Sequence, residues 1–188
     1  ISYKMGQETG GGGPGDGWDL KVIHCTTNTC SSRNTNIVDD GTAGTDAAGS
    51  YTSLKLDSSG NPVIVSGRGD VNLPGLNGDL RFVHCNDVNC ASETANVITL
   101  DGTGATNCAA SDTSRCDSGD VGWYNKLQLD SSEFPVIVYR STDIADLKVI
   151  HCNDANCSND GVTPSTYENM ERLDGCTGCD DSLPSSSG

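Results

Sequence analysis

The chain has 188 residues, and its 11 basic and 26 acidic side chains give a formal net charge of −15. Nucleic acids and anionic membranes require a basic surface on the proteins that bind them, so this acidic excess argues against both as partners. The sequence also holds no apolar run of the roughly 18 residues needed to span a membrane. We therefore expect neither a nucleic-acid partner nor insertion into a membrane.

A pattern that occurs three times organises the chain. Each copy is an apolar stretch that ends in His-Cys and is followed by a second cysteine five residues later, as in Asp19–Cys30, Asp79–Cys90 and Asp146–Cys157. Internal repetition of this kind is typical of a repeat array. The predicted array covers residues 1–188, with approximate units 1–49, 50–121 and 122–181 and a tail, 182–188, that resembles the start of a further unit.

Short apolar runs predict four strands in each full unit. The runs alternate apolar and polar residues and are bounded by Gly, Asn, Asp and Ser, and no segment shows a helical period. We therefore predict an all-β protein of tandem four-stranded antiparallel blades, each a meander. In chain order the predicted strands are 1–4, 19–25, 36–41, 51–56, 62–65, 79–84, 96–102, 124–129, 135–138, 146–151 and 170–175.

The two ends of the chain predict self-association. The segment 1–4 aligns with 64–67 and 137–140, so the chain opens inside a strand, and the tail resembles the strand that should precede it. Because an unpaired strand edge is a template for another chain, head-to-tail pairing could build a filament. The alternative is a boundary inside a longer covalent array. The residues expected to pair between subunits are Ile1, Ser2, Tyr3, Lys4, Ser182 and Leu183.

The ten cysteines fall into close pairs, and this spacing predicts disulfides. An even number of locally paired cysteines is typical of an oxidising compartment, so we expect an extracellular or cell-surface protein. A loop this short contributes about 2 kcal/mol in the chain-entropy estimate. The predicted pairs are Cys25 with Cys30, Cys85 with Cys90, Cys108 with Cys116, Cys152 with Cys157, and Cys176 with Cys179.

The three histidines raise the question of a metal site. Neighbouring residues on a strand point to opposite faces, and the His-Cys spacing does not match the usual zinc patterns, so we predict no zinc. His24, His84 and His151 share a face with the apolar residues before them, which favours a buried histidine bonded to a neighbouring turn over a ligand-binding role. Asp-rich turns leave calcium as an alternative, although no EF-hand loop is present, and we predict no cofactor.

The repeated motifs resemble the tandem β-propeller-type repeats of large secreted bacterial proteins. The resemblance is carried by Leu-Asp-Ser-Ser-Gly-Asn-Pro-Val-Ile at 56–64, by the His-Cys strands and by the trailing cysteine. It implies a four-stranded blade per unit, with loops at one rim available for binding. Closed propellers use about 4 to 8 blades, so about three units predict that the blades do not close within one chain.

These observations predict a structural protein rather than an enzyme. No nucleophile with its base, and no pair of carboxylates in a cleft, can be identified in the sequence. We expect an extracellular repeat protein that forms a subunit or segment of a self-associating filament or surface array. The alternative is a lectin-like or adhesive module whose rim loops bind carbohydrate or protein, with Trp18 and Trp123 as candidate stacking residues. Ser- and Thr-rich segments at 26–35 and 182–187 could carry O-linked sugars.

Overall fold

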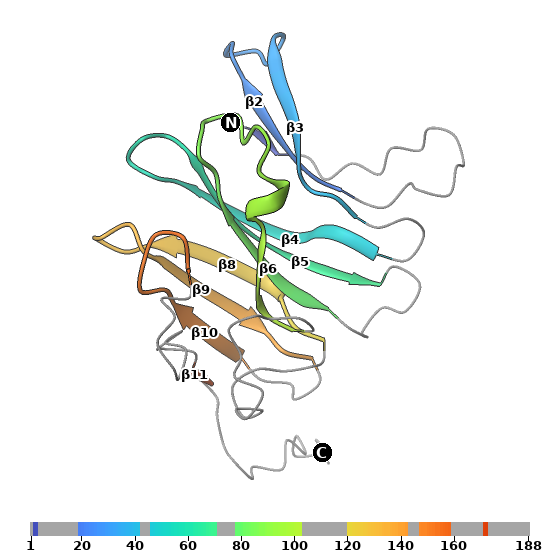
Figure 1. The fold of residues 1–188 in the computed structure, drawn as a ribbon, viewed down its shortest axis with the longest axis vertical. Coiled ribbons are helices and arrows are strands. Elements are labelled where there is room, and N and C mark those ends of the chain that lie inside the picture. The colour runs from blue at the N-terminus through green and yellow to red at the C-terminus, as the bar shows by residue number, and fades with distance from the viewer. Residues whose placement is uncertain are drawn as a thin grey trace, which may run out of the picture.

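Three antiparallel sheets follow one another along the chain (Figure 1). The structure is a computed structural model, and it describes residues 2–3, 19–41, 46–70, 78–102, 120–142, 147–158 and 171–172. Within these ranges the chain is all-β apart from one turn of 3-10 helix, η1, at Thr94–Asn96. The prediction of an all-β protein with antiparallel sheets is confirmed.

The first sheet has three strands in the order β1-β2-β3, with bounds Ser2–Tyr3, Leu20–Cys25 and Arg33–Asp39. Ser2 pairs with Ile23 in the first sheet, whereas Ile64 pairs with Val83 at the corresponding place in the second. Ser2 therefore takes the place of Ile64, and the predicted alignment of Ile1 with Ile64 is wrong by one residue. A two-residue strand carries too little alternation to set its own register.

The second and third sheets have four strands each, in the orders β4-β5-β6-β7 and β11-β10-β9-β8. Both are meanders, in which each strand pairs with the next along the chain, as predicted for a full unit. The strands of the second sheet are β4 (Asp46–Leu56), β5 (Pro62–Asp70), β6 (Asp79–His84) and β7 (Ile98–Asp101). Those of the third are β8 (Trp123–Leu129), β9 (Pro135–Arg140), β10 (Leu147–His151) and β11 (Glu171–Arg172).

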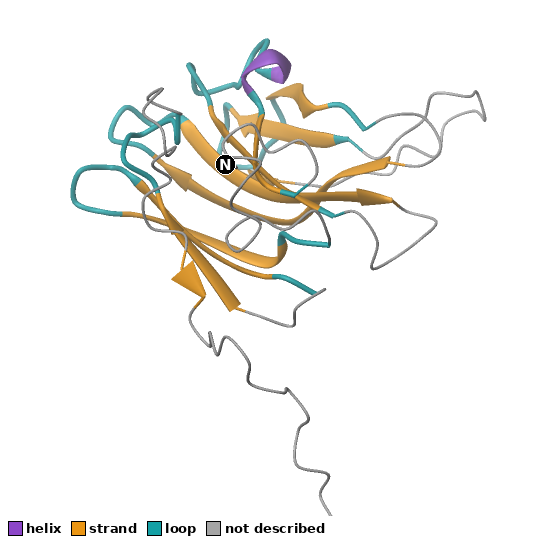
Figure 2. Ribbon diagram, turned by 60° about the horizontal axis from the view of Figure 1, so that its bottom comes forward, coloured by secondary structure: helices purple, strands orange, loops and turns teal. Residues whose placement is uncertain are grey.

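The second sheet lies between the other two and buries side chains on both faces (Figures 1 and 2). Alternation along β6 explains this, because successive side chains point to opposite faces. Leu80 and Phe82 pack against the third sheet, while Val83 and Cys85 pack against the first. The three sheets are stacked rather than closed or arranged like a propeller, so the propeller-like geometry of the prediction is not observed.

Two glycines allow close approach at matching places in the stack. A Cβ on Gly49 (φ +85°) would lie 3.2 Å from the Cα of Leu20, and one on Gly122 (φ +84°) would lie 2.8 Å from the carbonyl oxygen of Asp79. Positive φ suits glycine, and the missing side chain leaves room for the preceding sheet. These glycines therefore bring β4 against the first sheet and β8 against the second.

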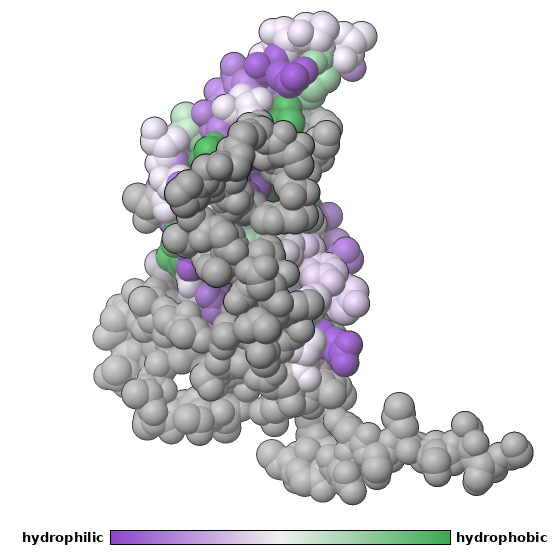
Figure 3. Space-filling view, turned by 90° about the vertical axis from the view of Figure 1, so that its right-hand side faces the viewer, coloured by the Kyte–Doolittle hydropathy of each residue, from purple (hydrophilic) through white to green (hydrophobic). Residues whose placement is uncertain are grey.

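The described surface is largely polar on the face shown in Figure 3, where few side chains are strongly hydrophobic. Across the described ranges, no helix combines the length and hydropathy that a membrane crossing requires.

Candidate functional site: the repeated interface between sheets

Three of the five predicted disulfides are present, each with its Cα atoms 4.7 to 5.0 Å apart. They are Cys25–Cys30, Cys85–Cys90 and Cys152–Cys157, and each closes a loop directly after a histidine-bearing strand. None of the cysteines in the described ranges is free. The other two predicted pairs, Cys108 with Cys116 and Cys176 with Cys179, lie outside the described residues.

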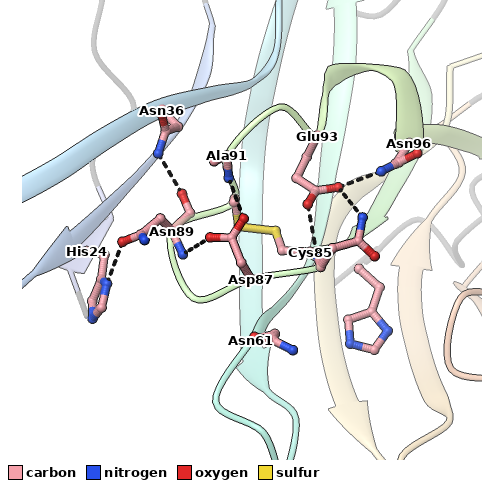
Figure 4. Close-up of a disulfide and its surroundings, with 12 residues drawn as sticks. His24, Asn36, Asn61, Cys85, Asp87, Asn89, Ala91, Glu93 and Asn96 are labelled. Carbon is pink, nitrogen blue, oxygen red and sulfur yellow. Dashed lines mark hydrogen bonds between the residues drawn. A yellow bond between two sulfur atoms is a disulfide. The ribbon is translucent and has the colours of Figure 1, made fainter.

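Each disulfide loop is held by a side chain that accepts bonds from its backbone. In the second loop the Asp87 carboxylate accepts the backbone N–H of Asn89 at 2.7 Å and that of Ala91 at 3.2 Å (Figure 4). Asp154 plays this part in the third loop and Thr27 in the first. Asp and Thr side chains commonly stabilise turns in this way. The three loops therefore have similar local structures, each held by its own turn side chain.

The last cysteine of each loop has a backbone conformation that non-glycine residues rarely adopt. Its φ is 54° at Cys30, 51° at Cys90 and 48° at Cys157. Such a conformation persists when its surroundings over-determine it. Here the disulfide and the turn bonds on either side hold the cysteine in place. The same strained geometry thus recurs in every unit.

In each four-stranded sheet, an aspartate in the turn between the first two strands bonds to the histidine of the same sheet. Asp57 accepts the backbone N–H of Asn61 through Oδ1 at 2.7 Å, and its Oδ2 lies 3.0 Å from Nε2 of His84. In the third sheet Oδ2 of Asp130 lies 2.8 Å from Nε2 of His151. The turn between the first two strands of a sheet is therefore fastened to the third strand.

These bonds lower the pKa of both turn aspartates. Burial alone would raise the pKa of Asp57, but the hydrogen bonds from His84 and Asn61 outweigh it and leave that pKa below its usual value. The hydrogen bond from His151 and the backbone N–H of Phe134 lower the pKa of Asp130. Both carboxylates are thus stabilised as anions in the folded protein.

The histidines also connect one sheet to the disulfide loop of the next. Nδ1 of His84 lies 2.9 Å from the carbonyl oxygen of Ala155 in the third loop, and Nδ1 of His24 lies 2.8 Å from Oδ1 of Asn89 in the second (Figure 4). The prediction that a histidine bonds to a neighbouring turn is confirmed for both. In both cases this turn belongs to the following sheet, which nothing in the sequence indicates.

His84 faces an acceptor at each ring nitrogen. The Ala155 carbonyl oxygen and the Asp57 carboxylate both lie within hydrogen-bond distance of the imidazole ring. Both ring nitrogens of His84 are therefore engaged in contacts of this interface.

His151 differs from the other two histidines because no sheet follows it among the described residues. Its side chain is 44% exposed, and Asp130 is its partner within the described part of the chain. The prediction that all three histidines are buried is therefore wrong for His151. Its position corresponds to that of His84, but the face it lies on is not covered by a further described sheet.

A buried aspartate also pairs with a cation across each interface. Nζ of Lys148 lies 2.8 Å from Oδ2 of Asp101, with side-chain exposures of 1% and 0%, and the Tyr139 hydroxyl donates to the same oxygen at 2.6 Å. At the other interface the corresponding aspartate, Asp39, accepts from Arg68 at 2.7 Å and from Arg81 at 3.3 Å. Lys148 and Arg81 follow the first leucine of the histidine strand in their respective sheets.

A third kind of contact joins the turns of the second and third sheets. The Glu133 carboxylate accepts the backbone N–H of Ser58 at 2.7 Å and its hydroxyl at 2.9 Å. Glu133 occupies the turn position held by Gly60 in the preceding sheet. This contact has no counterpart between the first two sheets within the described residues, because the first sheet has no equivalent turn there.

An aromatic cluster lies where β4 meets β8. The ring centroids of Tyr51 and Trp123 are 5.0 Å apart, and those of Tyr51 and Tyr124 are 4.7 Å apart. Tyr124 is 59% exposed, while the Trp123 Nε1–H donates to the Asp120 carboxylate at 2.7 Å. Burial raises the pKa of Tyr51, and the neighbouring Tyr124 raises it further. Tyr51 and Tyr124 thus expose aromatic surface, while the carboxylate that holds Trp123 is buried.

Several predicted site residues cannot be placed. Ile1, Lys4, Ser182, Leu183 and Trp18 lie outside the described residues. The remaining two residues predicted for pairing between subunits, Ser2 and Tyr3, form β1 and pair with β2 of the same chain. Within the described part of the chain, no group of three His, Cys, Asp or Glu side chains is placed to hold a metal ion.

A scan against protein-family models and searches of curated proteins and of solved structures returned no match for this chain. The functional interpretation therefore depends on the geometry of the interface.

Proposed function

We propose that this chain is a non-enzymatic extracellular structural repeat protein, a subunit or segment of a self-associating filament or surface array. The observation that carries the proposal is the recurrence of one contact set at both interfaces. Each interface pairs a histidine with the next disulfide loop and a buried aspartate with a cation from the next sheet. A contact set that repeats in this way allows any number of sheets to stack, because each added sheet presents a further histidine on its outer face.

The two outer faces of the stack support the same proposal. On the third sheet Leu147 is 41% exposed, although Leu80 at the corresponding position of the second sheet is buried. On the first sheet Ile37 is also exposed. Exposed apolar side chains of this kind favour further stacking.

The compartment and the absence of catalysis belong to the proposal as well. Three short-range disulfides support an oxidising, extracellular setting. The proposed non-enzymatic role is supported by the use of His84 and His24 as structural donors between sheets. No serine, threonine or cysteine side chain bonds to a histidine among the described residues, and such a bond is the usual mark of an activated nucleophile.

Sedimentation velocity over a concentration series, followed by electron microscopy, tests this function. We expect the sedimentation coefficient to rise with concentration and elongated particles to appear at the highest concentrations. A chain that stays monomeric throughout, with single compact particles, would contradict the proposal. The experiment uses the oxidised chain, and mass measurement before and after alkylation verifies that its disulfides are intact.

A lectin-like function is the second candidate, and the aromatic cluster favours it. Tyr51 and Tyr124 present exposed ring surface on which a sugar ring can stack, and the buried Asp120 carboxylate holds the neighbouring Trp123 in place. Glycan-array binding that is lost in Tyr124→Ala, and kept in Lys126→Ala on the same strand, would establish this function. Binding that is equal in both variants, or absent from the unaltered chain, would rule out the cluster as a sugar site.

A further inference from the structure

We propose that the His151–Asp130 pair is the docking site for the Cys25–Cys30 loop of a second copy of this chain. The contact would continue the stack by one more sheet, with the partner's first sheet placed where a fourth sheet would lie. This inference deepens the proposed self-association and rests on it, since it names the residues and the polarity of the contact.

His84 and His151 are held in matching geometry by the turn aspartates of their sheets. Nε2 of His84 is fixed by Asp57 at 3.0 Å, which leaves Nδ1 to bond the next loop. Nε2 of His151 is fixed by Asp130 at 2.8 Å in the same way. The ring of His151 is therefore held ready, with Nδ1 available for a loop that the described chain does not supply. His24 bonds the second loop, so both of the other histidines already make this type of contact.

The Cys25–Cys30 loop is more exposed than the other two disulfide loops. The cysteines of the second and third loops are buried against a preceding sheet, whereas Cys25 and Cys30 are only half-buried and residues 26–29 are exposed. The turn itself is the same, because the Cys30 N–H donates to the Thr27 carbonyl at 2.9 Å as the Cys90 N–H donates to the Asp87 carbonyl at 3.1 Å. The first loop is thus a formed loop without a described histidine partner.

Apolar side chains lie beside each half of the proposed site. Leu147 and Val149 occupy the positions that Leu80 and Phe82 hold in the second sheet, on the face that lies toward the next sheet. Leu80 and Phe82 are buried by the third sheet, while Leu147 is exposed and Val149 half-buried. On the opposite half, Ile23 lies where Val83 lies in the second sheet. The outer face of the third sheet therefore resembles one side of the interface between sheets, and the outer face of the first sheet resembles the other side. The chain already forms this interface twice.

One position limits how closely the copies can approach. Arg140 of the third sheet corresponds to Gly67, where an added Cβ would lie 3.2 Å from the Gly122 carbonyl oxygen of the next sheet. An arginine there must turn aside, so the contact is concentrated at the histidine end of the face. Arg140→Gly should accordingly tighten the association.

The contact is heterologous, because the histidine face of one copy meets the loop face of another. Each assembly then exposes a histidine face at one end and a loop face at the other, so the filament is polar. An isologous dimer would instead use the same face twice and would stop at two chains.

Sedimentation equilibrium of the full 188-residue chain tests the site. We expect His151→Ala and Leu147→Ala each to raise the association Kd at least tenfold. Leu56→Ala is the matched control, because Leu56 is 43% exposed on the second sheet and Leu147 is 41% exposed on the third. It should leave Kd within twofold. Thermal melts of each variant, together with the milder His151→Gln, verify that the altered chains are folded.

A mixing experiment tests the polarity. Cys25→Ala with Cys30→Ala opens the docking loop, and His151→Ala removes its receptor, so each variant alone should be largely monomeric. An equimolar mixture should form dimers and nothing longer, because one variant keeps a functional loop and the other a functional receptor. A mixture that stays monomeric would overturn the proposed docking.

The outcomes separate this inference from the proposed function. If the unaltered chain associates and His151→Ala associates equally well, the docking site is wrong while self-association stands. If the unaltered chain remains monomeric at every concentration, both fail.

Discussion

Nδ1 of His84 and the carbonyl oxygen of Ala155 lie 2.9 Å apart, although 71 residues separate them in the chain. The same imidazole bonds Asp57 of its own sheet through Nε2. One side chain therefore fastens a turn within the second sheet and joins that sheet to the third.

His84→Ala should lower the free energy of unfolding by about 1 to 3 kcal/mol, because it removes the side chain that bonds both the Ala155 carbonyl and the Asp57 carboxylate. Urea denaturation measures the change. His151→Ala is the comparison, since it removes a more exposed histidine with one partner among the described residues, and it should cost less. Equal losses in the two variants would show that the bond to Ala155 adds no stability.

Lys148→Met should destabilise the protein by about 3 to 5 kcal/mol, because it leaves the Asp101 carboxylate buried without its cation. Replacing both partners, as in Lys148→Met with Asp101→Asn, should recover part of this loss, since no charge is then left buried and the amide oxygen can still accept from the Tyr139 hydroxyl. A double-mutant cycle by urea denaturation measures the coupling. Losses that simply add would contradict the pairing.

Removing the disulfide of either of the first two loops should lower the free energy of unfolding by about 2 kcal/mol, because the unfolded chain gains conformational entropy. Cys85→Ala with Cys90→Ala should cost more than Cys25→Ala with Cys30→Ala, because the second loop is also packed against the first sheet and bonded to His24. Denaturation curves of the two double variants measure the difference. If the second loop costs no more than the first, its contact with His24 does not stabilise the stack.

The protein should lose stability in acid through its turn and loop aspartates. Burial raises the pKa of Asp154, but hydrogen bonds from Ser158 and nearby backbone N–H groups leave it below the usual value, and the pKa of Asp57 is also lowered. A lowered folded pKa gives stability that is present above the unfolded value of 3.8 and is lost as the pH falls through the folded pKa. Urea midpoints measured down to about pH 2 follow this loss.

Asp57→Asn provides the control for the acid series. It removes one of the titrating carboxylates, so its stability should fall less steeply in acid than that of the unaltered chain. An unchanged pH dependence would mean that Asp57 does not contribute to the acid transition.

Local features of the chain were sufficient to predict the strands and three of the disulfides. The alternation in 79–84 and 146–151 marks each histidine strand, and a spacing of five residues brings each cysteine within reach of its partner across a turn. The start of the chain was placed one residue out of register, because β1 has two residues and no alternation to compare.

The contacts between sheets were not predicted, because nothing local marks them. Asp101 was recognised as the end of a strand, yet its cation lies 47 residues away in the next sheet. His84 was expected to bond to a turn, but the turn on its own sheet and the loop on the next cannot be distinguished by spacing. Asp39 and Asp101 occupy equivalent positions in their sheets, and each pairs with a cation of the next sheet. This equivalence is evident only when the registers of the strands are known.

The order of amino acids is thus enough to define the sheets, their meander order and the loops closed by disulfides, since each depends on neighbours within a few residues. The stacking of the sheets, the pairing of Asp101 with Lys148 and the exposure of His151 depend on which faces meet in the folded chain. The contacts between faces are determined by the packing of apolar side chains and by buried charged pairs. The residues that form these contacts lie tens of positions apart in the chain, so no short-range sequence pattern indicates them.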